Sequence, residues 1–461
     1  MNVRNLLLIT VDCLRPDYLG CYGNRDVPTP SIDRLAEEGV LFENVVSNGS
    51  DTFSSVPSMF TSRLPNMLRP GLPSVVSALK DAGYVTAAFN PNALMLLEPW
   101  LRPHKWFDHY QTFLSVERRF VKRRLKSLLT KLGDMAVSRF GGGSPATRIL
   151  MEILWRLPTA VDRPCPPAER LNEEALAWIE EQGDGRFFVW VHYMDLHEPL
   201  LPPEEFLPDG FSRSLVMRVN RKRRYLRDLL TEEDLDVLRS LYRAEVRHVD
   251  RCVGDLVEGL RRLGHGGNTI VFLTADHGEM LGEHGKVGHR GDVGLYERLL
   301  RVPLIIHDRE AGGTRIREPV SLLDLGPTIL DYAGVEPPPT FQGQSLTPLI
   351  RGTGRYKVRP TVSFCRTGKR ILRVAMRKGR YKIVLDLETG RRALYDLEGD
   401  PNEERDLSEE KGALAESLET ELEELLARLE KESRGVLERE RVRMRAARVR
   451  RKLAELEARK Q

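Results

Sequence analysis

The residues whose side chains are best suited to catalysis or metal binding follow an apolar run in the second half of the chain. This run, Thr269 to Leu273, is rich in β-branched and aromatic residues and predicts a buried strand. Asp276, His277 and Gly278 come shortly after it. Parallel sheets bind ligands at the carboxyl ends of their strands, where a carboxylate beside an imidazole suits a divalent cation and a glycine permits close approach. A solvated loop rich in His and Glu is the competing interpretation.

A second carboxylate occupies a similar place near the N-terminus. Residues 5–11 (N-L-L-L-I-T-V) form an unalternating hydrophobic run that ends at Asp12. Such a run is typical of a strand buried on both faces of a parallel sheet. If this strand and the strand before Asp276 are neighbours, both carboxylates face one site. The alternative is that Asp12 only caps the following turn.

A hydroxyl-rich segment, residues 47–65 (S-N-G-S-D-T-F-S-S-V-P-S-M-F-T-S-R-L-P), predicts a loop that leads into a helix N-terminus. A helix N-terminus offers free N–H groups and the positive end of the helix dipole to an anion. A hydroxyl held there beside a metal could become nucleophilic through a lowered pKa. From composition alone, an ordinary Ser/Thr-rich helix cap is the better interpretation of this segment.

These segments, together with five further motifs, resemble the sulfatase family of the alkaline phosphatase superfamily. The further motifs are V-D-C-L-R-P-D-Y-L-G-C-Y-G at 11–23, V-H-Y-M-D-L-H-E-P at 191–199, L-Y-E-R-L-L-R-V-P-L-I-I at 295–306, L-L-D-L-G-P-T-I-L-D-Y-A-G-V at 322–335 and L-Y-D-L-E-G-D-P-N-E at 394–403. They follow the family's order. The resemblance implies an α/β fold with a doubly wound mixed sheet flanked by helices, a small C-terminal antiparallel sheet and a long C-terminal helix.

The nucleophile of that family opens a pattern like C-x-P-S-R-x-x-x-L-T-G. Laid on this chain without a gap, the pattern places the nucleophile at Thr52. A competing alignment begins at Ser55 and needs a deletion before Thr61, so we favour Thr52. The arginine expected four residues after the nucleophile is replaced by Val56 in the first alignment and by Met59 in the second.

A threonine at this position changes the chemistry that the resemblance implies. Sulfatases resemble one another in converting the Cys or Ser to formylglycine, and threonine cannot be converted in that way. Thr52 would instead form a covalent ester that water hydrolyses, as in phosphatase and phosphodiesterase relatives. We therefore expect a metal-dependent hydrolase of sulfate or phosphate esters, including phosphodiesters and phosphonate monoesters. The alternatives are a phospho-head-group transferase and a catalytically inactive anion-binding protein.

The resemblance also implies a set of metal ligands. Asp12, Asp276 and His277 match the family's ligands, while Cys13 stands where the family has a second aspartate, so that one oxygen ligand is missing. We expect one divalent ion, which could be Ca²⁺, Mn²⁺, Mg²⁺ or, with Thr52 as a fourth ligand, Zn²⁺.

Three further residues are candidates for acid–base or charge-stabilising roles. His197 matches the family histidine that contacts the transferring anion or the leaving group, and it could donate a proton there. His289 occupies the place where relatives carry Lys or His, and Lys286 is close by. Either could stabilise developing negative charge. His192 is interpreted as a packed residue.

The composition favours an ordinary globular protein. The 461 residues include 71 basic and 67 acidic ones, a net charge of +4 that indicates no particular macromolecular partner. The five cysteines have no C-x-x-C spacing, which favours a reducing compartment. Neither a signal peptide nor an apolar run of spanning length is apparent. We therefore expect a cytoplasmic enzyme that acts on a small anionic ester, with no nucleic-acid partner.

Three regions are expected along the chain. Residues 1–355 would form the catalytic domain, with a helical insertion at about 107–166. Within it, the basic amphipathic stretch Glu117 to Lys131 could contact a membrane surface or cover the site, or simply pack on the core. A basic cluster from Arg218 to Arg227 could gather anionic substrate or form a charged surface loop.

The C-terminal part divides into two. Residues 356–408 contain three predicted strands, Ile371–Arg377, Tyr381–Asp386 and Ala393–Asp396, and would form the small antiparallel sheet. Residues 409–461 are dominated by Glu, Arg, Leu, Ala and Lys, which predicts a charged helical tail through which the chain could form homo-oligomers.

Overall fold

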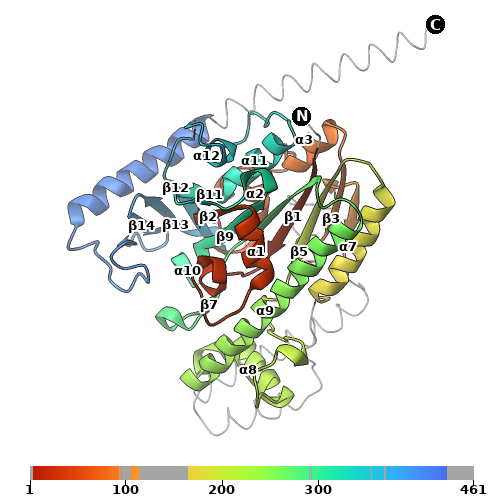
Figure 1. The fold of residues 1–461 in the computed structure, drawn as a ribbon. Coiled ribbons are helices and arrows are strands. Elements are labelled where there is room, and N and C mark those ends of the chain that lie inside the picture. The colour runs from red at the N-terminus through yellow and green to blue at the C-terminus, as the bar shows by residue number, and fades with distance from the viewer. Residues whose placement is uncertain are drawn as a thin grey trace.

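A mixed sheet of nine described strands lies at the centre of the structure, a computed structural model (Figure 1). The structure describes residues 4–92, 95, 105–113, 165–289, 291, 293–354, 356–367 and 370–432. The strands are β1 (Asn5–Val11), β2 (Val40–Val46), β3 (Val85–Phe89), β4 (His109–Gln111), β5 (Phe187–Tyr193), β6 (Thr269–Ala275), β9 (Arg301–His307), β10 (Thr314–Ile316) and β11 (Val320–Ser321).

The order of the sheet places β1 and β6, the strands that precede Asp12 and Asp276, side by side. The order is β10-β2-β9-β6-β1-β5-β3-β4, with β11 also paired to β2, and only the pairings of β9 are antiparallel. Val11 at the end of β1 lies opposite Tyr193 of β5 and Ala275 of β6. Every residue of these three strands is buried, as their unalternating hydrophobic runs predict.

Two groups of helices flank the sheet (Figure 1). In one group α9 (Glu232–Arg262) packs on α1 (Pro30–Glu38) and α7 (Ala168–Gln182); in the other, α2 (Thr52–Thr61), α3 (Val75–Asp81) and α11 (Leu325–Tyr332) pack together. Further described helices of α type are α8 (Arg213–Tyr225), α10 (Glu297–Leu300), α12 (Thr347–Ile350) and the helix of residues 412–432. The doubly wound mixed sheet predicted from the sequence is confirmed.

Local sequence signals fix the ends of the long helix α9. Thr231 caps it by accepting a hydrogen bond from the N–H of Asp234, whose carboxylate accepts from the N–H of Thr231 in return. Gly264 follows the last turn with φ +83°, a left-handed conformation that favours glycine. The sequence thus marks both ends of this helix locally.

A second, antiparallel sheet is formed near the C-terminus by β12 (Thr361–Thr367), β13 (Arg370–Lys378), β14 (Tyr381–Asp386) and β15 (Arg392–Asp396), in that order. Three of its strands match the predicted ones, and Gly379 and Gly390 adopt left-handed conformations in the turns between these strands. The strand β12 was not predicted. It connects the small sheet to the main domain, since Phe364 forms a β-bridge with Gly49.

The helix formed by residues 412–432 packs against the small sheet. Its apolar face is buried in a cluster with the sheet, through Ala415, Leu418 and Leu422. The boundary expected at residue 409 is therefore not a break in packing, because this part of the expected tail completes the small subdomain. Residues 433–461 lie outside the described part.

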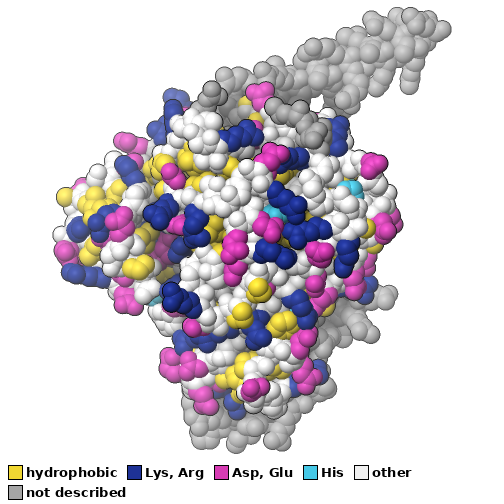
Figure 2. Space-filling view, viewed as in Figure 1, with side chains coloured by type: hydrophobic (Ala, Val, Ile, Leu, Met, Phe, Trp, Pro, Cys, Tyr) yellow, Lys and Arg dark blue, Asp and Glu magenta, His cyan; other side chains and the backbone are white. Residues whose placement is uncertain are grey.

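The expected insertion begins later than its sequence suggests. The short strand β4 falls within the range 107–166, yet it pairs in parallel with β3 at the edge of the main sheet. The amphipathic stretch Glu117 to Lys131 lies outside the described residues. Figure 2 shows basic and acidic side chains interspersed over one face of the molecule, in keeping with the nearly balanced charge.

The state of the cysteines and the character of the helices can be examined in the described residues. The five cysteines are all free thiols. Among the described helices, none combines the length and the apolar character needed to cross a bilayer.

We predict that Leu422→Ala lowers the free energy of unfolding by about 2–5 kcal/mol, because it removes a fully buried side chain from the small subdomain. Glu424→Ala, at an exposed position of the same helix, should change it by less than about 0.5 kcal/mol. Urea denaturation followed by circular dichroism measures both. Equal, small effects of the two substitutions would contradict the packing of this helix on the sheet.

Candidate active site

Two carboxylates lie buried at neighbouring strand ends. Asp12 follows β1, where its N–H donates to the carbonyl of Tyr193 (2.9 Å), and Asp276 follows β6. Both side chains are fully buried, and Asp276 Oδ2 has no hydrogen-bond partner among the described residues. Burial and the charge of Asp12 raise the pKa of Asp276. Burial also disfavours the charge on Asp12, but four histidines nearby lower its pKa to about 2.

His277 adds to this pair of carboxylates a ring nitrogen that can accept a hydrogen bond. Its Nδ1–H donates to the carbonyl of Gly278 (2.9 Å), which leaves Nε2 as the acceptor in the neutral ring. Nε2 lies 3.6 Å from Asp12 Oδ1 and 3.6 Å from Asp276 Oδ2. A histidine that donates one N–H to a carbonyl and presents the other nitrogen to carboxylates has the orientation typical of a metal ligand.

Gly278 is needed for a backbone contact in this position. Its N–H donates to the carbonyl of Leu299 (2.8 Å), and a Cβ atom would lie only 2.0 Å from the carbonyl oxygen of Arg298. The close approach that the sequence suggested is thus an approach of backbone to backbone.

Thr52 is the first residue of α2, and its hydroxyl reaches the carboxylate pair. Oγ1 lies 3.3 Å from Asp12 Oδ2 and 3.3 Å from His277 Nε2. Asp51 begins the helix by accepting from the N–H of Ser54 (3.0 Å). The competing candidate, Ser55, lies one turn along the helix, where its hydroxyl donates to the carbonyl of Asp51 (3.0 Å).

The loop before α2 is held from two sides. Ser47 Oγ donates to the carbonyl of Asp276 (2.6 Å), which ties the loop to the end of β6. On the other side, Ser363 of β12 donates to the carbonyl of Ser47 (2.6 Å). The small C-terminal sheet therefore helps to fix the helix start that carries Thr52.

His192 joins the cluster, which its sequence context did not reveal. Its Nδ1 lies 2.7 Å from Thr10 Oγ1, and its Nε2 lies 3.8 Å from Asp12 Oδ2 without a hydrogen bond to any described residue. Burial lowers the pKa of His192, so the ring is neutral and can act as a ligand. His192 lies near Asp12 because β5 pairs with β1, and only a prediction of that pairing could have placed His192 in the cluster.

Cys13, predicted among the metal ligands, lies beside the cluster as a neutral thiol. It is fully buried, with φ +66°, and its Sγ donates to Asp12 Oδ1 (2.9 Å). Burial, followed by the charges of neighbouring carboxylates, raises the pKa of this thiol well above its usual value. Since thiolate is the form that binds metals, the thiol here is placed to orient Asp12.

The two predicted catalytic histidines lie together above this cluster. The ring centroids of His197 and His289 are 5.3 Å apart, and those of His289 and His277 are 4.5 Å apart. His289 Nδ1 lies 3.1 Å from an oxygen of Glu279, which is fully buried. Burial alone would lower the pKa of His289, but Glu279 raises it to about 9, so the ring carries a positive charge at neutral pH.

Lys286 is exposed in the hairpin between β7 (Met280–Leu281) and β8 (Val287–Gly288). No contact among the described residues joins its ammonium group to the cluster. The same hairpin is tied down by Glu283, which binds Arg15 (2.6 Å), and by His284, which bonds to the carbonyl of Asn402 (2.9 Å). Of the two cations considered from the sequence, the structure brings only His289 to the site.

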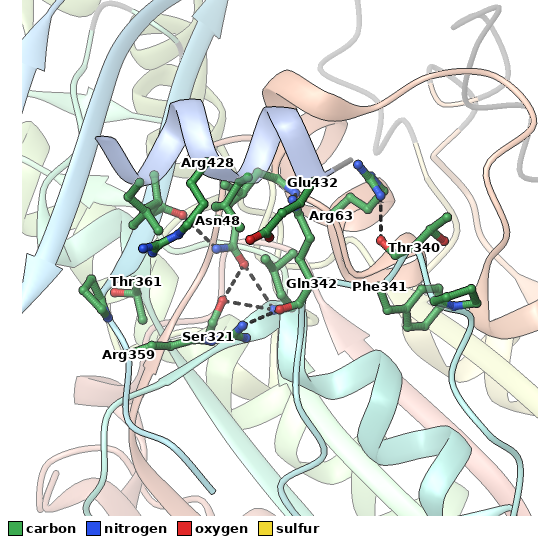
Figure 3. Close-up of a pocket in the computed structure, with 17 residues that line it drawn as sticks. Asn48, Arg63, Ser321, Thr340, Phe341, Gln342, Arg359, Thr361, Arg428 and Glu432 are labelled. Atoms are coloured by element: carbon green, nitrogen blue, oxygen red, sulfur yellow. Dashed lines mark hydrogen bonds between the residues drawn. The ribbon is translucent and has the colours of Figure 1, made fainter. Parts of the chain in front are cut away.

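A cavity of about 390 Å³ lies apart from this cluster (Figure 3). It is enclosed by the helix of residues 412–432, by β12 and by segments around Arg63 and Gln342. None of the predicted catalytic or metal-binding residues lines it. We therefore locate the chemistry at the strand ends and not in this cavity.

Two of the described clusters of His, Cys, Asp and Glu side chains with closely spaced ligand atoms lie at this site, although the neutral Cys13 thiol and the charged His289 ring do not favour metal binding. The ligand atoms of Asp12, His192 and Asp276 lie within 4.8 Å of one another, as do those of Cys13, His277 and His289. Two buried carboxylates, one of which has an oxygen without a hydrogen-bond partner among the described residues, and nearby imidazoles fit a divalent cation by donor type. Asp12 and Asp276 would hold it together with His192 or with His277, whose Nε2 lies 3.6 Å from an oxygen of each carboxylate.

Comparisons with known proteins agree with this architecture. The chain matches the family model described as Sulfatase over residues 4–335, and the model described as N-sulphoglucosamine sulphohydrolase, C-terminal, over residues 282–432. It is 24% identical over 450 residues to an arylsulfatase of Clostridium perfringens, covering 87% of this chain and 89% of that protein. It is 26% identical over 442 residues to iduronate 2-sulfatase of Homo sapiens, covering 80% and 73%.

The fold is also similar to that of solved structures. The phosphonate monoester hydrolase of Agrobacterium radiobacter matches with a TM-score of 0.68 and 22% identity, covering 92% of this chain and 96% of that chain. The phosphonate monoester hydrolase from Silicibacter pomeroyi gives a TM-score of 0.68 at 21% identity, with coverage of 93% and 95%. Since the family model matches well over half of the sequence, the chain belongs to the sulfatase family and to the class of the sulfuric ester hydrolases.

Proposed function

We propose that this protein is a divalent-metal-dependent hydrolase of sulfate or phosphate esters, including phosphodiesters and phosphonate monoesters, with Thr52 as the nucleophile. The observation that carries the proposal is the position of Thr52 Oγ1, 3.3 Å from both Asp12 Oδ2 and His277 Nε2 at the start of α2. A helix start favours negative charge, so both the attacking oxygen and an anionic substrate group are stabilised there.

The proposed reaction uses five side chains of the chain itself. Thr52 Oγ1 gives its proton to Asp12 Oδ2, which lies 3.3 Å away, attacks phosphorus or sulfur and forms a covalent ester as the bond to the leaving oxygen breaks. His197 protonates that oxygen. A divalent ion held by Asp12, Asp276 and His277 would supply Lewis acidity at this position. Water then hydrolyses the ester and regenerates the threonine.

The positive charge of His289 has a separate role in this scheme. Its pKa of about 9 keeps the imidazolium form at neutral pH, beside Cys13 and between the rings of His197 and His277. A fixed cation there would offset the negative charge that develops on the transferred group.

The substrate class follows from the nucleophile and from the relatives. Threonine cannot become formylglycine, so the covalent ester must be hydrolysed by water, a route that serves phosphoryl and phosphonyl groups. The relatives include proteins named as arylsulfatase and as phosphonate monoester hydrolase. We therefore propose both sulfate and phosphorus esters as substrates.

We predict that Thr52→Ala lowers kcat/KM by about 10³-fold or more, because no other described hydroxyl reaches the carboxylate pair. Ser55→Ala, one turn away, should retain activity within about 3-fold. Initial rates with aryl sulfates, aryl phosphate mono- and diesters and aryl phosphonates measure both variants. Full turnover by Thr52→Ala together with loss in Ser55→Ala would assign the reaction to the other residue.

We predict that turnover is lost on treatment with a chelator and returns with Mn²⁺, Mg²⁺, Ca²⁺ or Zn²⁺. Asp276→Asn should weaken metal binding by about 10–100-fold, because it removes one of two anionic ligands. Since the pKa of Asp276 is raised, protons compete with the ion and metal affinity should fall as pH decreases. Calorimetric titration of the chelated protein at several pH values measures this. Unchanged turnover at zero metal content would contradict the proposal.

A further inference from the structure

Arg223 is a buried arginine in the basic cluster of α8, whose other basic residues are exposed or half-buried. Its exposed fraction is 1%, whereas Arg218, earlier on the same helix, is exposed. Asn220 explains why this face of α8 turns inward: its amide accepts from the N–H of Leu200 (2.7 Å) and donates to the carbonyl of Leu200 (2.8 Å). The helix is thereby fixed to the segment that follows His197.

The guanidinium of Arg223 lies between two carboxylates from different loops. Nη2 is 3.0 Å from Glu279 Oε2, and Nε is 3.9 Å from Glu198 Oε2. Glu279 is the residue that pairs with His289. Glu198 follows His197 and provides the carbonyl that lies 2.9 Å from His197 Nδ1. One guanidinium thus contacts the partners of both candidate catalytic histidines.

Burying the guanidinium of Arg223 with two carboxylates has a cost in folding free energy. Removing a guanidinium and a carboxylate from water costs several kcal/mol per ion, which a well-formed ion pair offsets only in part. Arginine suits the position because its planar group can face two carboxylates at once, whereas the ammonium of a lysine is a single compact charge. A surface cluster that only gathered anions would need no buried member.

We infer that Arg223 is a positioning residue, which holds the loop of His197 and the loop of His289 at their working separation through Glu198 and Glu279. This inference rests on the proposed function, since it concerns the same site. Arg223 acts through the two histidines and does not itself need to contact the substrate.

Kinetics of matched variants test the inference. Arg223→Met keeps much of the side-chain volume without the charge, and we expect it to lower kcat by about 10²-fold, with KM changed by less than about 3-fold, because misplaced groups slow the chemical step. Arg223→Lys should recover part of the loss. Arg218→Met, the exposed control on the same helix, should match the wild type. Wild-type kcat in folded Arg223→Met would overturn the inference.

A double-mutant cycle tests whether Arg223 acts through Glu279. In a Glu279→Gln background, Arg223→Met should reduce kcat much less than it does alone, because the shared partner is already lost. If the double variant instead lost kcat by the product of the two single losses, this route of action would be overturned.

A measurement without turnover separates this inference from the proposed function. In the metal-free protein, the imidazole resonances of His197 and His289 should shift in Arg223→Met and stay unchanged in Arg218→Met, with the distant His307 as an internal reference. Unshifted resonances in folded Arg223→Met would overturn the inference. Shifted resonances in a protein that hydrolyses no ester would support the positioning role while rejecting the proposed function.

Discussion

The structure depends on the burial of two carboxylates at adjacent ends of parallel strands. Asp12 and Asp276 are fully buried, and the order β6-β1-β5 within the sheet places them together at the carboxyl ends of the strands. Two negative charges so close in a dry environment repel, which is why the pKa of Asp276 is raised by burial and by Asp12. The histidines around Asp12 lower its pKa and so offset part of this repulsion. Under the proposed function, a divalent cation held by these oxygens would offset the remainder.

The same constraint explains the role of the C-terminal sheet. The helix start that carries Thr52 must be held against the carboxylates, although its own loop contains glycine and small hydroxyl residues. Ser47 binds the backbone of Asp276, and Ser363 of β12 binds the backbone of Ser47. The position of the hydroxyl is therefore determined jointly by the main sheet and by the small subdomain. The helix of residues 412–432 contributes indirectly, because it completes the core of that subdomain.

Features with a local signal could be predicted from the sequence, and features that depend on tertiary pairing could not. The buried strands, the capped helix α9 and the strand ends at Asp12 and Asp276 are encoded by apolar runs and by their terminating residues. His192 looked like a packed residue because only its neighbour in the sheet reveals Asp12 beside it. Lys286 looked suitable because it is near His289 in sequence, yet the turn between β7 and β8 directs it to solvent.

The nucleophile position shows how far family membership constrains the chemistry. The scaffold and its ligand positions come with the family, but the attacking atom depends on a single side chain. Thr52 is β-branched, so its χ1 has few states and its oxygen has a restricted direction. In a helix start this stiffness is an advantage, because Oγ1 is held toward Asp12 and His277 without the entropy that a serine would lose. A threonine at this point is thus consistent with the direct attack that the proposed function requires.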